Sequence, residues 1–568
     1  MEMKDLQKLP VDLVFDAPDV EAFYGGKLPE PSTPFSAGVD LRAWLEEDSA
    51  EIAPGGRLRV RTGLHVQPKI PGWAGFVYSR SGLGARDGIV VAQGVGVIDP
   101  DYTGEITVYL LNTSAEPRRI QRGERIAQLI FQPYASPRFR KASSLEPAVS
   151  DTPAADCPPE QKTSKAADTM SQAFDSIKND EETYLLKTYA RYPLAIDHGK
   201  GSRLWDCDGK EYIDLLAGIA VCGLGHCNDE VIGALTEQAH KLWHVSNLFY
   251  QEPQIQLAKL LVSTAHFAKA FFCNSGAEAN EAAIKLARRY TRKIAGRDAP
   301  DIITLTSCFH GRTLGTLAAT GRADLMDGFT PVAGGFKQVP ANDLSALEAA
   351  VDDRTCAVMM ECIQGEAGVL PLNDDYVRGV EKLCRERGIL LICDEVQAGM
   401  CRTGKFWAFQ TYGIRPDIIS MAKALANGLP MGGILATEEV SKGFTTGSHA
   451  TTFGGGALVA AVASKVVEIM LRDHLAERAG ALGADFLDKL RALQKAMPDK
   501  IKAVRGRGLF VGIELFNTAR PAWNELLKRG FICSLCHETT LRLLPALNVP
   551  QTDLKFFVDT LADILAGK

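Results

Sequence analysis

The period of the apolar residues changes once along this chain of 568 residues, and that change restricts what it can fold into. Up to about Tyr134, apolar residues alternate with polar ones in short runs such as "GRLRVRTGLHVQP" and "GEITVYLLN", which glycine and proline interrupt. After about Met170, continuous apolar runs alternate with long stretches of helical period. Alternation indicates half-buried strands, whereas continuous apolar runs between helices indicate strands covered on both faces. The chain therefore contains two kinds of fold.

The first part predicts an all-β domain. Its strand-like runs are short and evenly spaced, and each is bounded by turn residues, which is typical of a barrel or jelly roll. In "GEITVYLLN", Ile106, Val108 and Leu110 fall on one face of the expected strand.

The second part predicts an α/β fold with a mostly parallel sheet. Buried-strand runs such as "KAFFC", "IITLT", "AVMME" and "ILLIC" alternate with helical patterns such as "AEANEAAIKLARRY" and "GVEKLCRERG". Strands that alternate with helices in this way are covered by helices on both faces. Because this part holds nearly 400 residues, we expect a large domain and a smaller terminal one.

A segment rich in proline, alanine and serine separates the two parts. It includes "SSLEPAVSDTPAADCPP" (Ser143–Pro159), and it contains too few apolar residues to offset the entropy of ordering it. We interpret it as a linker, which gives three regions: a β-barrel at 1–134, a linker at 135–170 and an α/β part at 171–568.

Composition excludes several classes of protein. The apolar content of 46%, the charged content of 23% and the net charge of -6 are normal for a globular enzyme and argue against nucleic-acid binding. The sequence contains no apolar run long enough to span a membrane and no export signal, so we expect no membrane association and a cytoplasmic location with reduced thiols. Cys533 and Cys536, followed by His537, form one CxxC pair, but no second ligand pair accompanies it to make a zinc site.

Three polar groups follow expected strands of the α/β part directly. "ILLIC" leads into Asp394, "DIISM" leads into Lys423 one residue later, and "KAFFCN" leads into a turn of small residues that opens a helix. In open α/β sheets, ligands bind at the carboxyl ends of the strands. A lysine amine condenses with an aldehyde, a carboxylate keeps a pyridine nitrogen protonated, and a helix N-terminus binds phosphate. Together these groups predict a pyridoxal-phosphate site.

The same stretches resemble a known family. "FFCNSGAEANEAAIKLAR", "CFHGRTLGTLAATG", "ECIQGEAGV", "LLICDEVQAGMCRTGKFWA" and "SMAKALANGLPMGG" are similar to the class III pyridoxal-phosphate aminotransferases of fold type I. The resemblance extends from about Asp175 to the C-terminus. A cofactor-binding relative without catalytic activity is the alternative.

The resemblance implies a role for each side chain of the cofactor site. Lys423 would join the cofactor aldehyde and move a proton between the substrate Cα and the cofactor, and Asp394 would pair with the pyridinium nitrogen. Phe309 and Val396 would pack on the two faces of the ring, and Gln397 would hydrogen-bond its hydroxyl. The phosphate would be bound by Ser275, Gly276, Ala277 and, from a neighbouring subunit, Thr452. This sharing implies a homodimer.

The substrate would be bound by two arginines. By resemblance, Arg542 binds the α-carboxylate of glutamate and pairs with Glu366 when an ω-amine is bound instead, while Arg312 binds the far carboxylate. "LAGIAVCGLGH" and "VSNLFYQEPQIQLAKLL" are most similar to the acetylornithine branch, which transfers an amino group between N2-acetyl-L-ornithine and 2-oxoglutarate in arginine biosynthesis. Enzymes for succinyl-diaminopimelate, ornithine and 4-aminobutyrate remain open as alternatives. "FGGGALV" departs from the family, which usually has Asn-Pro after the glycines.

The first part resembles the trimeric dUTP pyrophosphatases over about Leu13 to Pro133. "FSAGVDLRA", "YSRSGLGARDG", "VGVIDPDYTGEITVYLLN" and "RGERIAQLIF" stand in the order of that family's first four motifs. By this match Asp99 activates water for attack on the α-phosphorus of dUTP, and Tyr102 packs on the deoxyribose. Gln93 replaces the usual asparagine that reads uracil, and Asp40 orders water around the Mg²⁺ of the triphosphate. The phosphates would contact Arg80, Ser81, Gly82 and Gln128.

The family's fifth motif, a mobile tail with glycines, a phenylalanine and an arginine, has no counterpart here. "SSLEPAVSDTPAADCPP" stands in its place. Loss of this lid favours impaired or absent dUTP hydrolysis, with a nucleotide-binding or trimerisation module as the alternative to a working enzyme. A trimeric barrel and a dimeric aminotransferase in one chain are compatible with a closed hexamer of D₃ symmetry; the alternatives are an open network or the loss of one interface.

Overall fold

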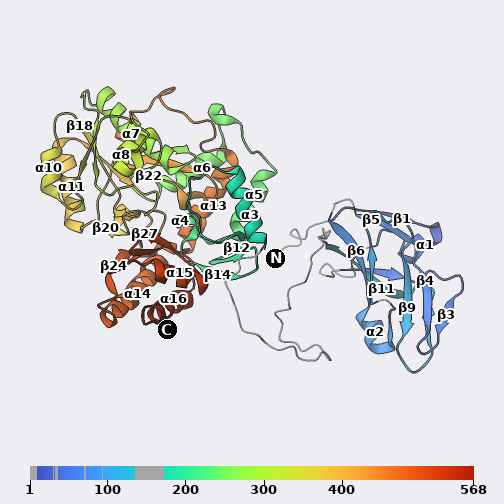
Figure 1. The fold of residues 1–568 in the computed structure, drawn as a ribbon. Helices are drawn as coiled ribbons and strands as arrows, with labels where there is room; N and C mark the ends of the chain where they lie inside the picture. Colours follow the sequence, from blue (N-terminus) through green and yellow to red (C-terminus); the bar gives the residue numbers. More distant parts are fainter. Residues whose placement is uncertain are drawn as a thin grey trace. The chain divides into compact units, whose positions relative to one another are not determined.

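The computed structural model describes residues 9–29, 31, 36, 38–68, 72–92, 94–134 and 172–568. The chain divides into two compact units, Met1–Lys162 and Thr163–Lys568. The predicted linker at 135–170 lies outside the described residues, as does Gln93. Figure 1 shows a unit made mostly of strands and a larger unit of mixed helices and strands. The predicted fold class, a β-rich N-terminal domain followed by an α/β part, is confirmed.

Antiparallel strands form the first unit. Four are hydrogen-bonded in the order β2–β11–β6–β8, three in the order β4–β9–β7, and two further pairs are β1–β5 and β3–β10. Two short helices, α1 and α2, interrupt them. The bounds are β1 Val11–Phe15, α1 Pro18–Phe23, β2 Val39–Arg42, β3 Ser49–Ile52, β4 Arg57–Arg61, β5 Leu64–Pro68, β6 Trp73–Ser79, α2 Ser81–Asp87, β7 Ile89–Val91, β8 Val95–Ile98, β9 Thr107–Asn112, β10 Arg118–Gln121 and β11 Arg125–Pro133.

The core of this unit follows the predicted alternation. Ile106, Val108 and Leu110 are all at most 1% exposed, and they pack with apolar residues of the other strands. Tyr109, between two of them, is 44% exposed. One face of β9 therefore lies in the core and the other faces outward, as expected from the two-residue period of a strand.

A seven-stranded sheet forms the centre of the second unit. Its order is β15–β23–β22–β21–β18–β16–β17, and its pairings are parallel except where β23 lies antiparallel to β15 and β22. The strands are β15 Lys269–Cys273, β16 Asp301–Leu305, β17 Phe336–Val339, β18 Thr355–Met360, β21 Leu390–Asp394, β22 Ile418–Met421 and β23 Gly432–Ala436. Every residue of β16, β18, β21, β22 and β23 is buried, which explains their continuous apolar sequences.

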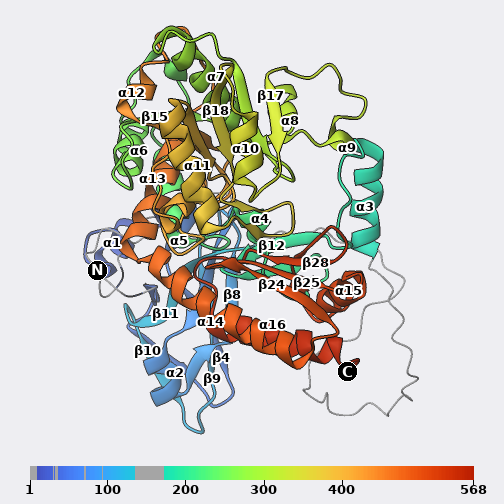
Figure 2. The same cartoon turned by 90° about the vertical axis from the view of Figure 1, so that its left-hand side faces the viewer.

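Helices pack around this sheet, as Figure 2 shows for α10, α11 and α7. The helix that follows β15 is longer than the sequence pattern predicts, and the one before β21 begins five residues earlier than predicted. The main helices of this region are α5 Asp229–Ala239, α6 Glu252–Val262, α7 Gly276–Lys293, α8 Leu314–Thr320, α10 Leu344–Ala350, α11 Asp374–Arg387 and α13 Ala457–Arg472.

The chain ends in a smaller α/β lobe, in which α14, α15 and α16 gather beside β24 (Figure 1). A four-stranded antiparallel sheet, β24–β25–β28–β27, forms its framework. Its elements are α14 Leu475–Ala496, β24 Ile501–Arg507, β25 Phe510–Leu515, α15 Arg520–Lys528, β27 Ser534–Cys536, β28 Thr540–Leu543 and α16 Gln551–Leu565.

The start of the second unit joins this lobe through a second mixed sheet, β12–β13–β14–β26. The elements are α3 Gln172–Tyr184, β12 Ile196–Lys200, β13 Arg203–Asp206, β14 Glu211–Asp214 and β26 Phe531–Ile532. Strand β14 pairs in parallel with β26, more than 300 residues later in the chain. The start of the second unit therefore packs with the C-terminal lobe.

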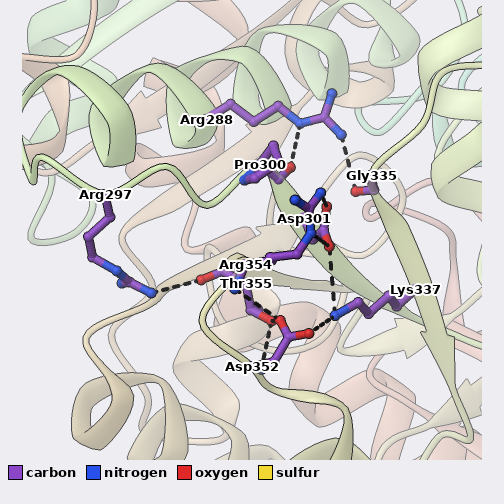
Figure 3. A network of polar contacts seen from close by, with 9 residues as sticks. All are labelled: Arg288, Arg297, Pro300, Asp301, Gly335, Lys337, Asp352, Arg354 and Thr355. Carbon is purple, nitrogen blue, oxygen red and sulfur yellow. Dashed lines mark hydrogen bonds and ion pairs between the residues drawn. The ribbon is translucent and has the colours of Figure 1, made fainter.

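Charged residues occupy the amino end of the large sheet as a closed network (Figure 3). The buried Asp301, at the start of β16, binds the Arg354 guanidinium through two contacts of 3.1 Å and lies 3.7 Å from the Lys337 ammonium. Lys337 also binds Asp352 at 2.6 Å. Because each of these charges has an opposite charge beside it, this cluster fastens strands together and offers no open site.

No helix among the described residues is both long and apolar enough to cross a membrane. Within the same residues, no group of three or more His, Cys, Asp and Glu side chains is arranged to hold a metal ion. Cys533 and Cys536 are buried free thiols.

Candidate functional site

The predicted cofactor residues meet in one cavity of about 420 Å³ at the carboxyl ends of β21 and β22. The walls also include the turn between β15 and α7. Of the residues expected in this site, the cavity lining includes Ser275, Gly276, Ala277, Phe309, Arg312, Asp394, Val396, Gln397 and Lys423. Adjacent parallel strands bring their ends to one edge of the sheet, so residues far apart in sequence converge there.

Lys423 is partly buried and begins a short 3-10 turn, Lys423–Ala426, that follows β22. Its backbone has a left-handed φ of 46°. Burial lowers the pKa of the Lys423 ammonium, although Asp394, Glu366 and Glu361 act in the opposite direction. A lowered pKa increases the fraction of neutral amine, which is the nucleophilic form.

Asp394 ends β21 and is 5% exposed. Its Oδ2 accepts hydrogen bonds from Asn280 and His310, each 2.8 Å long, and its Oδ1 accepts the N–H of Val396 at 3.0 Å. Burial alone would raise the pKa of Asp394, but the hydrogen bonds and the charge of His310 more than offset it, so the pKa is lowered. The group therefore remains a carboxylate at neutral pH.

His310 is 2% exposed. Burial would lower its pKa, but Cys308 and Asp394 raise it well above its usual value. The His310 ring and Asp394 thus form a buried ion pair at the edge of the cavity.

Glu361 follows β18 and lies in the cavity wall. Its carboxylate accepts the N–H of Phe309 at 2.9 Å and of Gly365 at 3.4 Å. Burial and the nearby Asp394 raise the pKa of Glu361 to about 7. The hydrogen bond to Phe309 fixes the backbone that presents the predicted stacking ring.

The turn before α7 combines a helix N-terminus with a close backbone approach. The Ser275 hydroxyl accepts the N–H of Glu278 at 3.2 Å and caps the helix. A Cβ on Gly276 would lie 2.7 Å from a methyl carbon of Val396, so only glycine fits between this turn and the segment that follows Asp394. The N–H groups of an 18-residue helix therefore reach the cavity.

Arg542, on β28, is 3% exposed and borders the cavity through Gln397. Its Nη1 forms an ion pair with Glu366 and donates to Gln397 Oε1 at 3.2 Å, while its Nε donates to Ser534 at 3.0 Å. Burial would raise the pKa of Glu366, but Arg542 outweighs it and the pKa is lowered. The structure thus brings together the predicted Arg542–Glu366 pair.

The other predicted substrate arginine and the predicted shared threonine are exposed. The Arg312 guanidinium lies 5.7 Å from the centre of the Phe309 ring. Thr452 is not among the residues that line the cavity of its own chain. The unusual "FGGGALV" places Gly456 at the N-cap of α13, so the helix forms without the Asn-Pro of the family.

In the first unit, Asp40, Arg80 and Gln128 lie on neighbouring strands or at their ends. Gln128 of β11 is opposite Asp40 of β2 in the strand register. Asp40 accepts hydrogen bonds from Arg80 at 2.9 Å and from Arg125 at 3.2 Å. Both of its oxygens thus face arginines, and its predicted role in ordering water around Mg²⁺ remains a prediction.

Asp99 follows β8 and is exposed, and its carbonyl accepts the N–H of Tyr102 at 3.1 Å. The Tyr102 ring is 43% exposed, and its hydroxyl donates to the carbonyl of Glu105 at 3.1 Å. Ser81 and Gly82 begin α2; the side chain of Ser81 is outside the described part of the chain, and so is Gln93. The roles of these residues remain predictions.

Comparison with known families identifies both parts. Residues 184–565 match the family described as "Aminotransferase class-III". The chain belongs to the class III aminotransferases. Residues 25–152 match the dUTPase family, so the β-rich N-terminal unit is a dUTPase domain.

The aminotransferase part is similar to curated and solved relatives along almost their whole length. An acetylornithine aminotransferase of Methanocaldococcus jannaschii is 44% identical over 387 residues, which are 68% of this chain and 96% of that protein. One from Myxococcus xanthus is 43% identical over 387 residues, which are again 68% of this chain and 96% of that protein. An ornithine aminotransferase structure from Toxoplasma gondii has a TM-score of 0.67 at 30% identity, covering 69% of this chain and 95% of that one. An acetylornithine aminotransferase structure from Elizabethkingia anophelis has a TM-score of 0.64 at 32% identity, covering 70% of this chain and 100% of that one.

Class III aminotransferases use pyridoxal phosphate, and the residues of this aminotransferase fit it. The cavity joins a helix N-terminus, an ionised carboxylate and a partly buried lysine with a lowered pKa. Asp394 Oδ1 accepts one N–H and can accept another donor. The gap beside Gly276, which a Cβ would fill, gives backbone access to a phosphate.

Three polar residues of the aminotransferase site were not predicted from the sequence: Asn280, His310 and Glu361. Glu361 had the same signal as Asp394, an acidic residue directly after a buried strand. Asn280 is a polar residue on the buried face of α7, four residues after Gly276. His310 gave no local signal, because its partner Asp394 is 84 residues away in the sequence.

Proposed function

We propose that this aminotransferase converts N2-acetyl-L-ornithine and 2-oxoglutarate to N-acetyl-L-glutamate 5-semialdehyde and L-glutamate, as in arginine biosynthesis. The observation that carries the proposal is the buried Arg542 with Glu366 beside it. Glutamate needs a cation for its α-carboxylate, whereas an ω-amine donor needs that cation neutralised. A carboxylate that pairs with the arginine and can leave it serves both substrates.

The names of the relatives support the same substrate pair. Both curated relatives described above are called acetylornithine aminotransferases. Arg312, exposed at the mouth of the cavity, is suited to the far carboxylate of either substrate.

The chain's own residues would bind the cofactor and move the proton. Bound pyridoxal phosphate supplies an electron sink for the electrons released at the carbon that bears the reacting amine, which is Cα of glutamate and Cδ of N-acetylornithine. Asp394, held by Asn280 and His310, would keep the ring nitrogen protonated, and the α7 N-terminus would hold the phosphate. The Nζ atom of Lys423, whose ammonium pKa is lowered by desolvation, would accept and return the proton of the carbon that bears the reacting amine.

A steady-state assay tests the proposal. The purified full chain is given 2-oxoglutarate with N-acetylornithine, ornithine, N-succinyl-diaminopimelate or 4-aminobutyrate, and glutamate formation is measured. We expect the highest kcat/KM with N-acetylornithine. A higher value with any of the other three donors would assign the enzyme to that donor instead.

We infer that the dUTPase domain hydrolyses dUTP slowly or not at all. The exposed Asp99 and the Arg80–Asp40 pair support binding of a nucleotide and water. However, the sequence at 143–159 lacks the glycines, phenylalanine and arginine of the lid motif. Excluding water from the phosphates depends on such a lid. Pyrophosphate release from dUTP with Mg²⁺ at the rate of a complete trimeric dUTPase would contradict this inference.

We propose that the aminotransferase part forms a homodimer that shares Thr452 between subunits, and that the barrels trimerise to give a hexamer of D₃ symmetry. Several large apolar side chains, one of them next to Thr452, are exposed in the single chain and suit a subunit interface: Trp243, Leu248, Phe249, Tyr250 and Phe453. Light scattering should give the mass of six chains. A dimer mass would exclude trimerisation by the barrel. We expect the protein in the cytoplasm, which cell fractionation would test.

A further inference from the structure

A left-handed turn lies beside the cofactor cavity. Ala217, Gly218, Ile219 and Ala220 have φ values of 48°, 65°, 64° and 62°. In this conformation the Cβ of an L-residue crowds the following carbonyl, so successive residues of this kind are rare. Three of the four are not glycine, and such a turn persists only where its surroundings hold it. The next residue, Val221, lines the cavity together with Lys423.

One carboxylate holds the start of this turn. Asp214, at the end of β14, accepts the N–H groups of Leu216 and Ala217 through Oδ1, at 2.8 and 2.9 Å. Its Oδ2 accepts from Nε2 of His226 at 2.7 Å. The Asp214 side chain is 2% exposed and that of His226 is 18% exposed. Asp214 therefore connects the start of the turn to a histidine after it.

His226 is itself fixed to the preceding sheet. Its N–H and carbonyl exchange two hydrogen bonds of 2.8 Å with Gly201, between β12 and β13. The side chains that interact with the His226 ring are Asp214 and Cys222, and their hydrogen bonds raise its pKa to about 10 against the effect of burial. Lys200, the neighbouring cation, instead binds Asp229 at 2.5 Å. The Asp214–His226 contact is thus an ion pair at neutral pH.

The loop between the turn and His226 is bonded to the segment that carries the reactive lysine. Leu224 N–H donates to Oδ1 of Asn427 at 2.8 Å, and the Asn427 amide donates to the carbonyl of Gly225 at 3.0 Å. Asn427 ends the 3-10 turn that Lys423 begins, and both have φ values of 46°. The loop therefore links the backbone at Val221 to the backbone of the turn that Lys423 begins.

We propose that Asp214 and His226 are positioning residues of the transamination site. Neither lines the cavity, and they act through the left-handed turn. The pair holds residues 217–220, which place Val221 in the cavity wall, and the loop that follows, whose Leu224 and Gly225 are bonded to Asn427. This role depends on the pyridoxal-phosphate chemistry of the family and not on which amine donor the enzyme prefers.

Two substitutions in the full-length holoenzyme test the positioning role of Asp214 and His226. His226→Gln keeps an amide N–H but removes the charge of the pair. We expect kcat per bound cofactor to fall by about 10- to 100-fold, with an altered visible absorbance spectrum of the bound cofactor. Adding Ala217→Gly should recover a large part of kcat, because glycine adopts a left-handed conformation without a steric penalty. The matched control is Ala479→Gly, which removes the same methyl group from a buried, right-handed position in α14 and should recover nothing.

Three results would overturn the proposal. The first is a His226→Gln enzyme with a lower Tm but unchanged kcat per bound cofactor and spectrum, because the pair would then only stabilise the fold. The second is equal effects of Ala217→Gly and Ala479→Gly. If His226→Gln alone does not fold, the double variants decide: folding with Ala217→Gly but not with Ala479→Gly supports the proposal, and failure of both rejects it.

Discussion

Glu366→Gln should change which substrate the aminotransferase prefers. In the wild-type enzyme, glutamate must displace Glu366 before its α-carboxylate reaches Arg542. The glutamine variant keeps the shape and removes the charge, so the displacement becomes easier. For N-acetylornithine, the charge of Arg542 is then no longer neutralised, and it repels the cationic amine. The variant should therefore gain in kcat/KM for glutamate and lose in kcat/KM for N-acetylornithine.

The size of the effect follows from the burial of the two partners. A hydrogen bond to a charged group contributes about 1.5 to 3 kcal/mol. The side chain of Arg542 is 4% exposed, but that of Glu366 is 33% exposed, so solvent screens part of the interaction. We take the lower end, about 1.5 to 2 kcal/mol, which corresponds to about a 10- to 30-fold change in the ratio of the two kcat/KM values.

Single-turnover absorbance measurements on each half-reaction provide the assay, because they separate the two substrates. The matched control is Glu381→Gln, which removes another charge from a glutamate–arginine pair that lies outside the site. The control should leave the ratio unchanged. If Glu366→Gln lowers both kcat/KM values equally, or leaves both unchanged, Glu366 does not act as a switch between substrates.

Three further variants test other parts of the structure. Gly276→Ala should weaken cofactor binding by about tenfold or more, measured by absorbance titration of the apoenzyme, because the new Cβ would lie 2.7 Å from Val396; unchanged affinity would show that the turn can move. Asp99→Asn should abolish whatever pyrophosphate release from dUTP the full chain shows, and residual release at the wild-type rate would remove Asp99 from the reaction. The stabilising effect of His226 should be complete below about pH 6.5 and lost as the pH rises toward 10, because Asp214 raises its pKa in the folded state. Denaturant unfolding of wild type and His226→Gln across this pH range would measure that loss. A difference in the free energy of unfolding that does not change with pH would contradict the prediction.

The positions of residues that are set by the neighbouring sequence were predictable. Asp394 ends one buried strand and Lys423 follows another, and strand ends in a parallel sheet meet at one edge whatever the details of packing. The alternation around Ile106 and Val108 likewise determined which face of β9 is buried, because the period of a strand is fixed by its backbone.

Residues whose partners lie on other elements were predicted only through family resemblance, or not at all. Arg542 and Glu366 are 176 residues apart, and their pairing came from resemblance. His310 and Asp394, 84 residues apart, were not predicted to meet. Nothing in the sequence near Asp301 indicated that its charge is closed in a network with Arg354 and Lys337 (Figure 3).

The sequence by itself determined the two fold classes, the order of the motifs and the strand ends at which the site forms, because these depend on periodicity and on neighbours along the chain. Only the tertiary structure decided which charges are paired and how strongly burial shifts their pKa values. It alone revealed the left-handed turn at 217–220, since that conformation opposes the preferences of its own residues and is held by Asp214 and its partner His226. Such features arise from contacts between separate elements, and those contacts exist only once the chain has packed.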